Sequence, residues 1–492
     1  MLNTNLRRIF YVIVAGFMAL IGTLSYWQVF AREAIAESPQ NSLQTIRNQE
    51  SPRGLILARD GETVLASSER QQDENGYAYT RVYPQGESFA NIVGYYSIRF
   101  GKAGIEAILD EHLSGSNDPR TLRELVNRST GGPQAGNNVE LTLDAELQKI
   151  AYEGLSQTST GRGSLVALDP ETGEVLALAS SPSYDPNRIG EDNYFQQLQQ
   201  NDSFPLINRA TQSLYAPGST FKVITAAAGL QAGLTPSSEF FDSGEYQTPG
   251  YTVTNYKGQS FGEVSFTEAL VYSINAVFAE IGVEIVGAQS LADMAQEFGF
   301  GDSYEDFLLP VDASDLGPPA SQWAQSETAL ASFGQGAVVS NAFEMALVAA
   351  TIANDGQTMQ PRILQEIRSP AGVLLESTSA EARRQVLSGQ HARELQGMMR
   401  AVVSEGNLEQ AKIEGVEVAG KTGTAEVGGG ESPHSWWISF APVDDPEIAV
   451  AAMVENGATI DAEGNADTPA IPIATEVTEA YLDGSSTNGR NG

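Results

Sequence analysis

The fold of this chain is decided by one stretch, Gly163-Ser164-Leu165-Val166-Ala167-Leu168-Asp169-Pro170-Glu171-Thr172-Gly173-Glu174-Val175-Leu176-Ala177-Leu178-Ala179. Two apolar runs of strand length flank an Asp-Pro-Glu-Thr-Gly turn, which predicts a β-hairpin. Three more strands are predicted late in the chain, over residues 416–425, 435–441 and 447–455. The long part between these two groups has a mainly helical pattern. We therefore predict an α/β fold with a five-stranded antiparallel sheet covered by helices.

Elements on either side extend this prediction. Residues 139–143 alternate as a half-buried strand does, and Asp144 is placed to cap the helix that follows. Residues 471–482 have helical spacing and predict a helix packed on the sheet. The span 137–484 is therefore expected to form one domain, and residues 485–492 a flexible tail.

Residues 31–136 read as a separate spacer domain. They are rich in glycine and short of long helical patterns. The segments 54–57 and 63–66 flank an Asp60-Gly61 turn, which predicts a hairpin. This part of the chain carries no convincing catalytic cluster.

The N-terminus predicts a membrane anchor. Residues 9–30 are uncharged and mostly apolar, a length that suits one membrane crossing. Arg7 and Arg8 precede this run, which places residues 1–8 in the cytoplasm and the rest of the chain outside. The alternative is a signal peptide cleaved near residues 34–36. Because the apolar region of a signal peptide is usually only about 7–15 residues long, we favour an uncleaved single-pass anchor.

The composition excludes several classes of function. The 492 residues include no cysteine, so a disulfide, a thiolate metal site and a cysteine nucleophile are all ruled out. His112, His391 and His434 stand far apart without ligand spacing, and no metal or other cofactor is predicted. A net charge of -34 argues against a nucleic-acid partner, because phosphate binding needs clustered Lys and Arg.

A serine and a lysine near residue 220 are the first candidates for chemistry. Ser219 and Lys222 are three residues apart at the start of a strong helix pattern, so they share a face of the helix. The free N–H groups of a first helical turn can bind an oxyanion. Lys222 is the candidate base for Ser219, provided that its surroundings lower its pKa. The alternative is that Ser219 only caps the helix and Lys222 lies on the surface.

The second candidate element is Ser273-Ile274-Asn275. Residues two apart do not face the same way on a regular helix. If Ser273 and Asn275 belong to one site, they must lie at a break between two helices. The alternative is that Asn275 caps the second helix.

The third candidate element, Lys421-Thr422-Gly423-Thr424, follows a strand pattern. Strand alternation puts Lys421 and Gly423 on one face and Thr422 and Thr424 on the other. Gly423 leaves room for close backbone approach, and a free strand edge could pair with an extended peptide. Lys421 would supply positive charge, and the threonine hydroxyls could hold a carboxylate.

These three elements together form the signature of the penicillin-recognising serine enzymes. The chain resembles their class B penicillin-binding proteins, and among these most closely the actinobacterial penicillin-binding protein A type. The stretches that carry this resemblance are 141–144 with 147–148, 167–177, 181–187, 208–210 and 434–437, and more loosely 53–54, 60–61 and 104–106. The resemblance covers nearly the whole chain.

The resemblance implies a D,D-transpeptidase of the penicillin-binding fold, anchored in the cell membrane with its catalytic domain outside the cytoplasm. Residues 31–136 would form the pedestal and 137–484 the transpeptidase domain. Ser219 would attack a stem peptide ending in D-Ala-D-Ala, with Lys222 as base. The N–H groups of Ser219 and Thr424 would bind the oxyanion.

The resemblance also assigns the later steps. Ser273, assisted by Lys421, would relay a proton to the departing D-Ala, while Asn275 orients the substrate amide. Thr422 and Thr424 would hold the terminal carboxylate, and β-lactam antibiotics would trap Ser219. Because no glycosyltransferase domain is recognisable in the sequence, the expected partner is a glycosyltransferase of the SEDS family.

Three alternatives remain. A class A β-lactamase would carry a Glu-x-x-Leu-Asn run, which does not occur between Asn275 and Lys421, and would leave the anchor and spacer unexplained. A D,D-carboxypeptidase or endopeptidase would share the signature but differ in its products. A catalytically silent scaffold would not need the intact signature. The sequence leaves open whether the protein serves growth or division, its oligomeric state and its β-lactam selectivity.

Overall fold

The computed structural model describes residues 51–73, 76–115, 135–460 and 466–488, together with 8, 11, 13–20 and 23 near the N-terminus. Among these residues, none of the helices combines the length and the apolar character that a membrane crossing requires. The predicted membrane helix over 9–30, the predicted cytoplasmic segment 1–8 and residues 31–50 lie largely outside the described part.

The predicted five-stranded antiparallel sheet is present. Its strands run in the order β17 (Ala419–Ala425), β18 (His434–Ala441), β19 (Ile448–Val454), β7 (Gly163–Leu168) and β8 (Val175–Ser181). Every neighbouring pair is antiparallel. β17 begins later than residue 416, where it was predicted, because Gly415 adopts φ +77° and Val416 bonds back to Ile413 in a local turn. β17 lies at the edge of the sheet.

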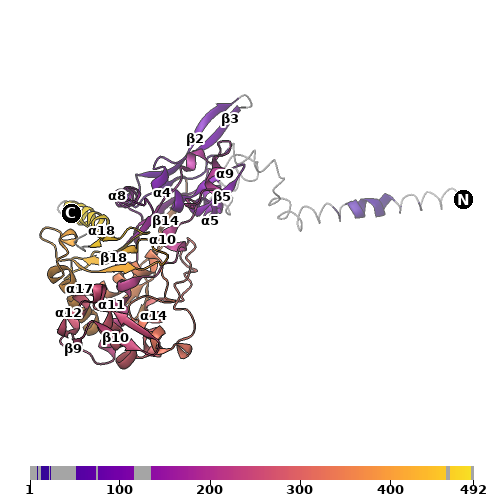
Figure 1. Ribbon diagram of the computed structural model, residues 1–492. Helices are drawn as coiled ribbons and strands as arrows, with labels where there is room; N and C mark the ends of the chain where they lie inside the picture. Colours follow the sequence, from indigo (N-terminus) through magenta and orange to yellow (C-terminus); the bar gives the residue numbers. More distant parts are fainter. Residues whose placement is uncertain are drawn as a thin grey trace.

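Both faces of this sheet are covered by helices. Trp436 and Trp437 are adjacent and both buried, yet they belong to two different apolar clusters, one on each face. One cluster contains α8 (Ala145–Ser156) and α18 (Ala470–Asn488), and the other contains α11 (Lys222–Gln231), α16 (Ala342–Ala353) and much of α17 (Gly389–Glu405). In Figure 1, α18 lies on one side of β18, and α11 and α17 lie on the other.

The capping prediction for α8 is confirmed. The Asp144 carboxylate accepts hydrogen bonds from the backbone N–H groups of Glu146 and Leu147. The last helix runs further than predicted, since α18 continues to Asn488 rather than ending at residue 482. Residues 485–488, expected to form part of a flexible tail, are therefore helical, and residues 489–492 lie outside the described part.

A second, six-stranded sheet joins segments that are distant in sequence. Its order is β15 (Leu374–Ser377), β14 (Leu364–Arg368), β6 (Asn138–Leu141), β1 (Ile56–Leu57), β2 (Val64–Asp73) and β3 (Gly76–Val82). The predicted β1–β2 hairpin is antiparallel, and β6 pairs parallel to β1. β2 and β3 project away from the rest of the molecule (Figure 1). Strands from both sides of residue 137 share this sheet, and the predicted domain boundary there stays a prediction.

A buried ionic cluster holds the helices beside this second sheet. Glu106 is fully buried and accepts from Arg53 at 2.8 Å and from Arg81 at 2.5 Å. Arg53 also bonds Asp110 at 2.7 Å. Removing one partner from such a cluster typically costs about 3–5 kcal/mol, because it leaves a buried charge unpaired. Arg53 and Glu106 belong to separate stretches of the predicted pedestal, and the fold brings them together.

The remaining elements are short. Their bounds are α4 (Glu87–Val93), β4 (Tyr95–Ser97), β5 (Gly101–Ala103), α5 (Gly104–Ile108), α6 (Asp110–Leu113), α9 (Tyr194–Gln199), α10 (Arg209–Gln212), β9 (Glu239–Asp242), β10 (Glu245–Thr248), β11 (Tyr251–Thr254), β12 (Gly262–Ser265), α12 (Phe266–Val271), α13 (Asn275–Glu280), α14 (Ala288–Phe298), α15 (Gln325–Ala331), β13 (Gln357–Met359), β16 (Ala382–Gln385), β20 (Thr459–Ile460) and β21 (Ala466–Asp467). The part between the two groups of sheet strands therefore contains several short hairpins that its helical pattern did not predict.

A buried carboxyl group on α16 makes the stability of this fold sensitive to pH. Glu344 accepts a hydrogen bond from the Tyr304 hydroxyl at 2.8 Å, while its other oxygen is buried without a partner. Burial raises the pKa of Glu344 from 4.5 to about 8. Between these two values the folded protein keeps a proton that the unfolded chain has released, so the folded state loses stability as the pH rises through this window.

We expect Glu344→Gln to reduce this pH dependence. The amide mimics the protonated carboxyl group, so the melting temperature of the variant should exceed that of the wild type above pH about 8 and approach it below pH about 4.5. Thermal melts of the full-length protein across this range provide the measurement. Glu479→Gln, an exposed site on α18, is the matched control. Equal slopes of melting temperature against pH for Glu344→Gln and the wild type would contradict the prediction.

Candidate active site

Ser219 lies at the mouth of the helix that carries Lys222. It is the second residue of the 3-10 turn η3 (Gly218–Phe221), which continues directly into α11. In such a turn, side chains three residues apart eclipse one another, so Ser219 and Lys222 point to the same side, as predicted. Ser219 is half-buried, whereas Lys222 is fully buried, which makes the alternative of a surface lysine wrong.

Contacts with the segment after α15, with strand β18 and with strand β17 hold η3 in place. The Gly218 N–H donates to the Gly334 carbonyl at 3.0 Å, and the Trp436 indole donates to the Ala216 carbonyl at 3.0 Å. Gly218 has φ +55°, and a Cβ there would lie only 2.7 Å from the Thr424 carbonyl oxygen. The peptide units of Gly218-Ser219 and of Thr424 are therefore neighbours.

The Lys222 amine is held by the Ser273–Asn275 element. Its Nζ lies 2.6 Å from the Ser273 carbonyl oxygen, 3.1 Å from the Ser273 Oγ and 2.7 Å from the Asn275 Oδ1. Among the described contacts of Lys222, none is a hydrogen bond to Ser219. The Lys222 amine is therefore held by Ser273 and Asn275 rather than by Ser219.

Ser273 and Asn275 lie at the predicted break between two helices. Ser273 has φ +56°, a left-handed conformation that is uncommon for serine, and separates α12 from α13. Asn275 is the first residue of α13, and Ile274 occupies the cap position without a side-chain cap. The alternative that Asn275 caps the second helix is therefore wrong, because its side chain is engaged with Lys222 instead.

The third element, Lys421 to Thr424, brings a second amine to Ser273. Lys421 is fully buried, and its Nζ lies 3.1 Å from the Ser273 Oγ and 3.4 Å from the Thr422 Oγ1. Along β17, Lys421 and Gly423 are buried, Thr422 is partly buried and Thr424 is exposed, in line with the predicted alternation. At Gly423 the close backbone approach comes from the protein itself, since a Cβ there would lie 2.8 Å from the Pro217 carbonyl.

The two buried amines share one environment that disfavours positive charge. Burial and the neighbouring Lys421 hold the pKa of Lys222 well below its usual value, and burial lowers the pKa of Lys421 to about 7. A neutral Lys222 can donate to the Ser273 carbonyl and to the Asn275 Oδ1, and its lone pair can accept from the Ser273 hydroxyl. The Ser273 oxygen can in turn accept from Lys421. The arrangement therefore provides a neutral base linked through one hydroxyl to a proton donor.

Two aromatic rings complete the surroundings of Lys222 and were not predicted. Its Nζ lies 5.5 Å from the ring centre of Phe278 and 6.0 Å from that of Phe333. Phe278 follows Asn275 by three residues on α13, a spacing that could have indicated a shared face. Phe333 comes from a loop distant in sequence, and no local pattern indicates it.

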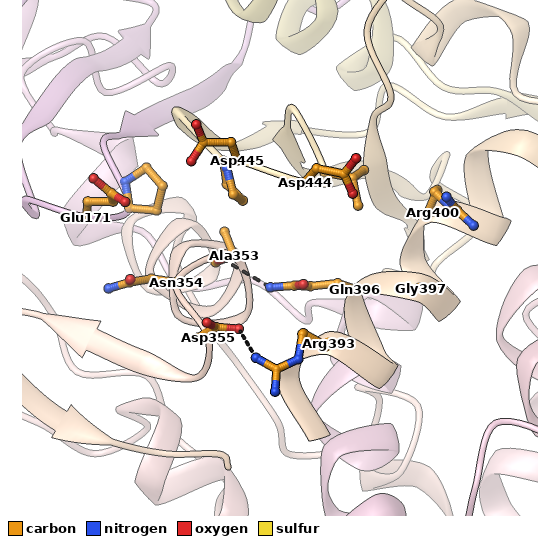
Figure 2. A pocket seen from close by; sticks show the side chains of 13 residues that line it. Glu171, Ala353, Asn354, Asp355, Arg393, Gln396, Gly397, Arg400, Asp444 and Asp445 are labelled. Atoms are coloured by element: carbon orange, nitrogen blue, oxygen red, sulfur yellow. Dashed lines mark hydrogen bonds and ion pairs between the residues drawn. The ribbon is translucent and has the colours of Figure 1, made fainter. Parts of the chain in front are cut away.

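A pocket of about 410 Å³ lies elsewhere and contains none of the predicted site residues. It is formed by the β7–β8 turn, the β18–β19 turn, the end of α16 and the middle of α17. Figure 2 shows Glu171, Asp444 and Asp445 on one side of this pocket, opposite the ion pair of Asp355 with Arg393, whose atoms lie 3.2 Å apart. These charges are mixed and largely exposed, so we assign no chemistry to the pocket.

Two known domain families match the chain. The penicillin binding protein transpeptidase domain matches residues 163–479, and the penicillin binding protein A dimerisation domain matches residues 53–139. The first match spans all three candidate elements. The chain belongs to the penicillin-binding protein transpeptidases.

Named relatives support this membership of the penicillin-binding proteins. The peptidoglycan D,D-transpeptidase PbpA of Mycolicibacterium smegmatis is 36% identical over 93% of this chain and 94% of its own length. PbpA of Mycobacterium tuberculosis is 36% identical over 98% of this chain and its whole length. The resemblance to the actinobacterial penicillin-binding protein A type is thereby confirmed.

Solved structures of penicillin-binding protein A from M. tuberculosis share the fold. Its ceftriaxone acyl-enzyme complex superposes with a TM-score of 0.82 at 35% identity, covering 89% of this chain and 99% of that one. Its penicillin G acyl-enzyme complex superposes with a TM-score of 0.81 at 35% identity, covering 88% of this chain and 100% of that one. The predicted penicillin-binding transpeptidase fold is therefore correct.

Proposed function

We propose that this penicillin-binding protein cross-links peptidoglycan as a serine D,D-transpeptidase, with Ser219 as the nucleophile. One observation carries the assignment of roles: the Ser273 hydroxyl lies 3.1 Å from each of two buried amines, Lys222 and Lys421, and Lys222 is one helical turn from Ser219. A serine whose lysine neighbour has a lowered pKa can lose its proton at neutral pH.

Acylation begins with the transfer of the Ser219 hydroxyl proton to the neutral Lys222 amine. The Ser219 oxygen forms a bond to the carbonyl carbon of the penultimate D-Ala of a stem peptide, and the carbonyl oxygen becomes an oxyanion. The backbone N–H groups of Ser219 and Thr424 stabilise it, a placement supported by the close packing of Gly218 on Thr424.

Collapse of this intermediate releases the terminal D-Ala. The bond between the carbonyl carbon and the D-Ala nitrogen breaks, and the nitrogen takes a proton from the Ser273 hydroxyl. Ser273 regains a proton from the two amines on either side of it, Lys222 and Lys421. Asn275 orients the substrate amide, and Thr422 and Thr424 on the free edge strand hold the terminal carboxylate.

The second half of the reaction joins two stem peptides. An amine of another stem peptide attacks the Ser219 ester, a new amide bond forms, and the proton returns to the Ser219 oxygen. A β-lactam enters by the same acylation but keeps its leaving group attached, so Ser219 stays esterified. The acyl-enzyme complexes of the M. tuberculosis relative with ceftriaxone and penicillin G support this behaviour.

We also propose the cellular setting of this activity. Residues 9–30 would form a single membrane helix, with residues 1–8 in the cytoplasm and the pedestal (31–136) and the transpeptidase domain (137–484) outside. A glycosyltransferase of the SEDS family would supply the glycan strands.

Mapping the acylated residue tests the assignment. The full-length protein is treated with labelled penicillin, digested, and analysed by mass spectrometry. The label is expected on the tryptic peptide that contains Ser219, and the purified protein should convert stem-peptide substrates into cross-linked dimers rather than into shortened monomers. An adduct on another side chain would overturn the assignment of Ser219, and shortened monomers alone would favour a carboxypeptidase.

A further inference from the structure

A buried pair of polar side chains lies beside Asn275, the residue that binds the Lys222 amine. Asp242 ends strand β9 and is 1% exposed, and Asn255 follows strand β11 and is 4% exposed. The Asn255 amide nitrogen donates to both carboxylate oxygens of Asp242, at 2.8 and 2.9 Å. Buried polar groups that are bonded in this way are rigid and specify one arrangement.

Asn255 caps helix α13 from outside that helix. The first N–H groups of a helix have no partner within it, and the cap residue of α13, Ile274, supplies none from its side chain. The Asn255 Oδ1 instead accepts from the Ala276 N–H at 2.9 Å. The first turn of α13, where Asn275 lies, is therefore held by a residue of another segment.

The backbone next to Asn255 orients the Asn275 side chain directly. The Asn275 Nδ2 donates to the Thr254 carbonyl at 3.3 Å, while its Oδ1 accepts from the Lys222 Nζ at 2.7 Å. If the amide were flipped, its NH₂ group would face the Lys222 amine, donor against donor. The Thr254 carbonyl thus favours the orientation in which Asn275 binds Lys222.

Asp242 fixes the loop that carries the Thr254 carbonyl and the Asn255 side chain. Beyond its two contacts with Asn255, its carboxylate accepts from the backbone N–H groups of Gly244 at 3.2 Å and of Phe261 at 2.9 Å. The carboxylate therefore ties the end of β9 to the segments on both sides of Asn255.

We propose that Asp242 and Asn255 are positioning residues for acylation, an inference that rests on the proposed function. They hold the start of α13 and the Thr254 carbonyl, which set the Asn275 amide and, through it, the Lys222 amine. Displacing a catalytic group by about 1 Å can cost about 100-fold in rate. Loosening this support also lets water reach Lys222, which moves its pKa back toward the usual value.

The test measures acylation of the full-length protein by fluorescent penicillin as a function of pH. Asn255→Ala is expected to lower the second-order acylation rate constant by about 10- to 100-fold. It should also shift the half-maximal point of the pH profile upward, because the Lys222 amine then loses its proton only at higher pH. Asn187→Ala is the matched control, since the Asn187 amide bonds the backbone N–H and carbonyl of Tyr83 at 2.9 and 3.0 Å and does not touch Lys222 or Asn275.

A double-mutant cycle covers the case in which Asn255→Ala does not fold. Asn255→Asp keeps an acceptor for the Ala276 N–H but sets a second carboxylate against Asp242, and should acylate slowly. Adding Asp242→Asn restores one amide and one carboxylate, and should recover much of the lost rate and return the pH profile toward that of the wild type.

Two results would overturn the positioning proposal. One is a wild-type rate and pH profile in folded Asn255→Ala, and the other is a double variant no faster than Asn255→Asp. Both results are compared with acylation of the wild-type protein, in which the label is located on Ser219. Failure to label wild-type Ser219 would instead refute the proposed function, so the two failures are distinguishable.

Discussion

Ser219→Ala is expected to abolish acylation by penicillin and the cross-linking of stem peptides. Removing the nucleophile of a serine enzyme lowers kcat by about 10⁶-fold, which places the remaining activity below detection. The fold should be unaffected, because Ser219 is half-buried and its hydroxyl makes no hydrogen bond within the described part of the chain. Fluorescent penicillin labelling on a gel and product analysis by mass spectrometry provide the measurements.

Ser156→Ala is the matched control for this experiment. Ser156 is an exposed serine at the end of α8, where its hydroxyl only donates to a carbonyl of the same helix. This variant should label and cross-link like the wild type. Cross-linking by folded Ser219→Ala would show that the chain uses another nucleophile, and would overturn the assignment of Ser219.

Lys222→Met is expected to give the second-largest loss. Methionine preserves the buried volume but cannot take the Ser219 proton, and loss of a general base typically costs about 10²- to 10⁴-fold. Because the pKa of Lys222 lies well below its usual value, the wild type should acylate well at neutral pH and lose rate on acidification as the amine is protonated. The variant should lose that acid limb as well as the rate, which stopped-flow acylation at a series of pH values can measure.

The matched control for Lys222 is Lys149→Met. Lys149 is an exposed lysine on α8 whose amine forms a 3.8 Å ion pair with Glu153. It should keep the wild-type rate and pH profile. An unchanged acid limb in folded Lys222→Met would assign the titration to another group, with Lys421 the nearest candidate because its pKa is about 7.

Much of the fold was predictable because its information is local. The hairpin of β7 and β8 was predicted nearly to the residue, since long apolar runs on either side of a turn leave little choice of structure. The cap at Asp144 was equally predictable. The strands β14 and β15 were missed, because they are short, lie partly at the surface and are stabilised mainly by pairing with strands elsewhere in the chain.

The candidate site also combines features that were predictable from local sequence with features that only tertiary contacts produce. Sequence alone predicted the candidate residues and which of them share a face, because Ser219 and Lys222 stand three apart in a helix pattern and Lys421 lies in an alternating strand pattern. Only the tertiary structure decided that a single hydroxyl, that of Ser273, lies between the two amines, and that Asn275 binds Lys222 instead of capping its helix. Burial lowers the pKa values of both lysines, and burial is produced by segments that meet only after folding, so no local pattern could have predicted the protonation state on which the chemistry depends.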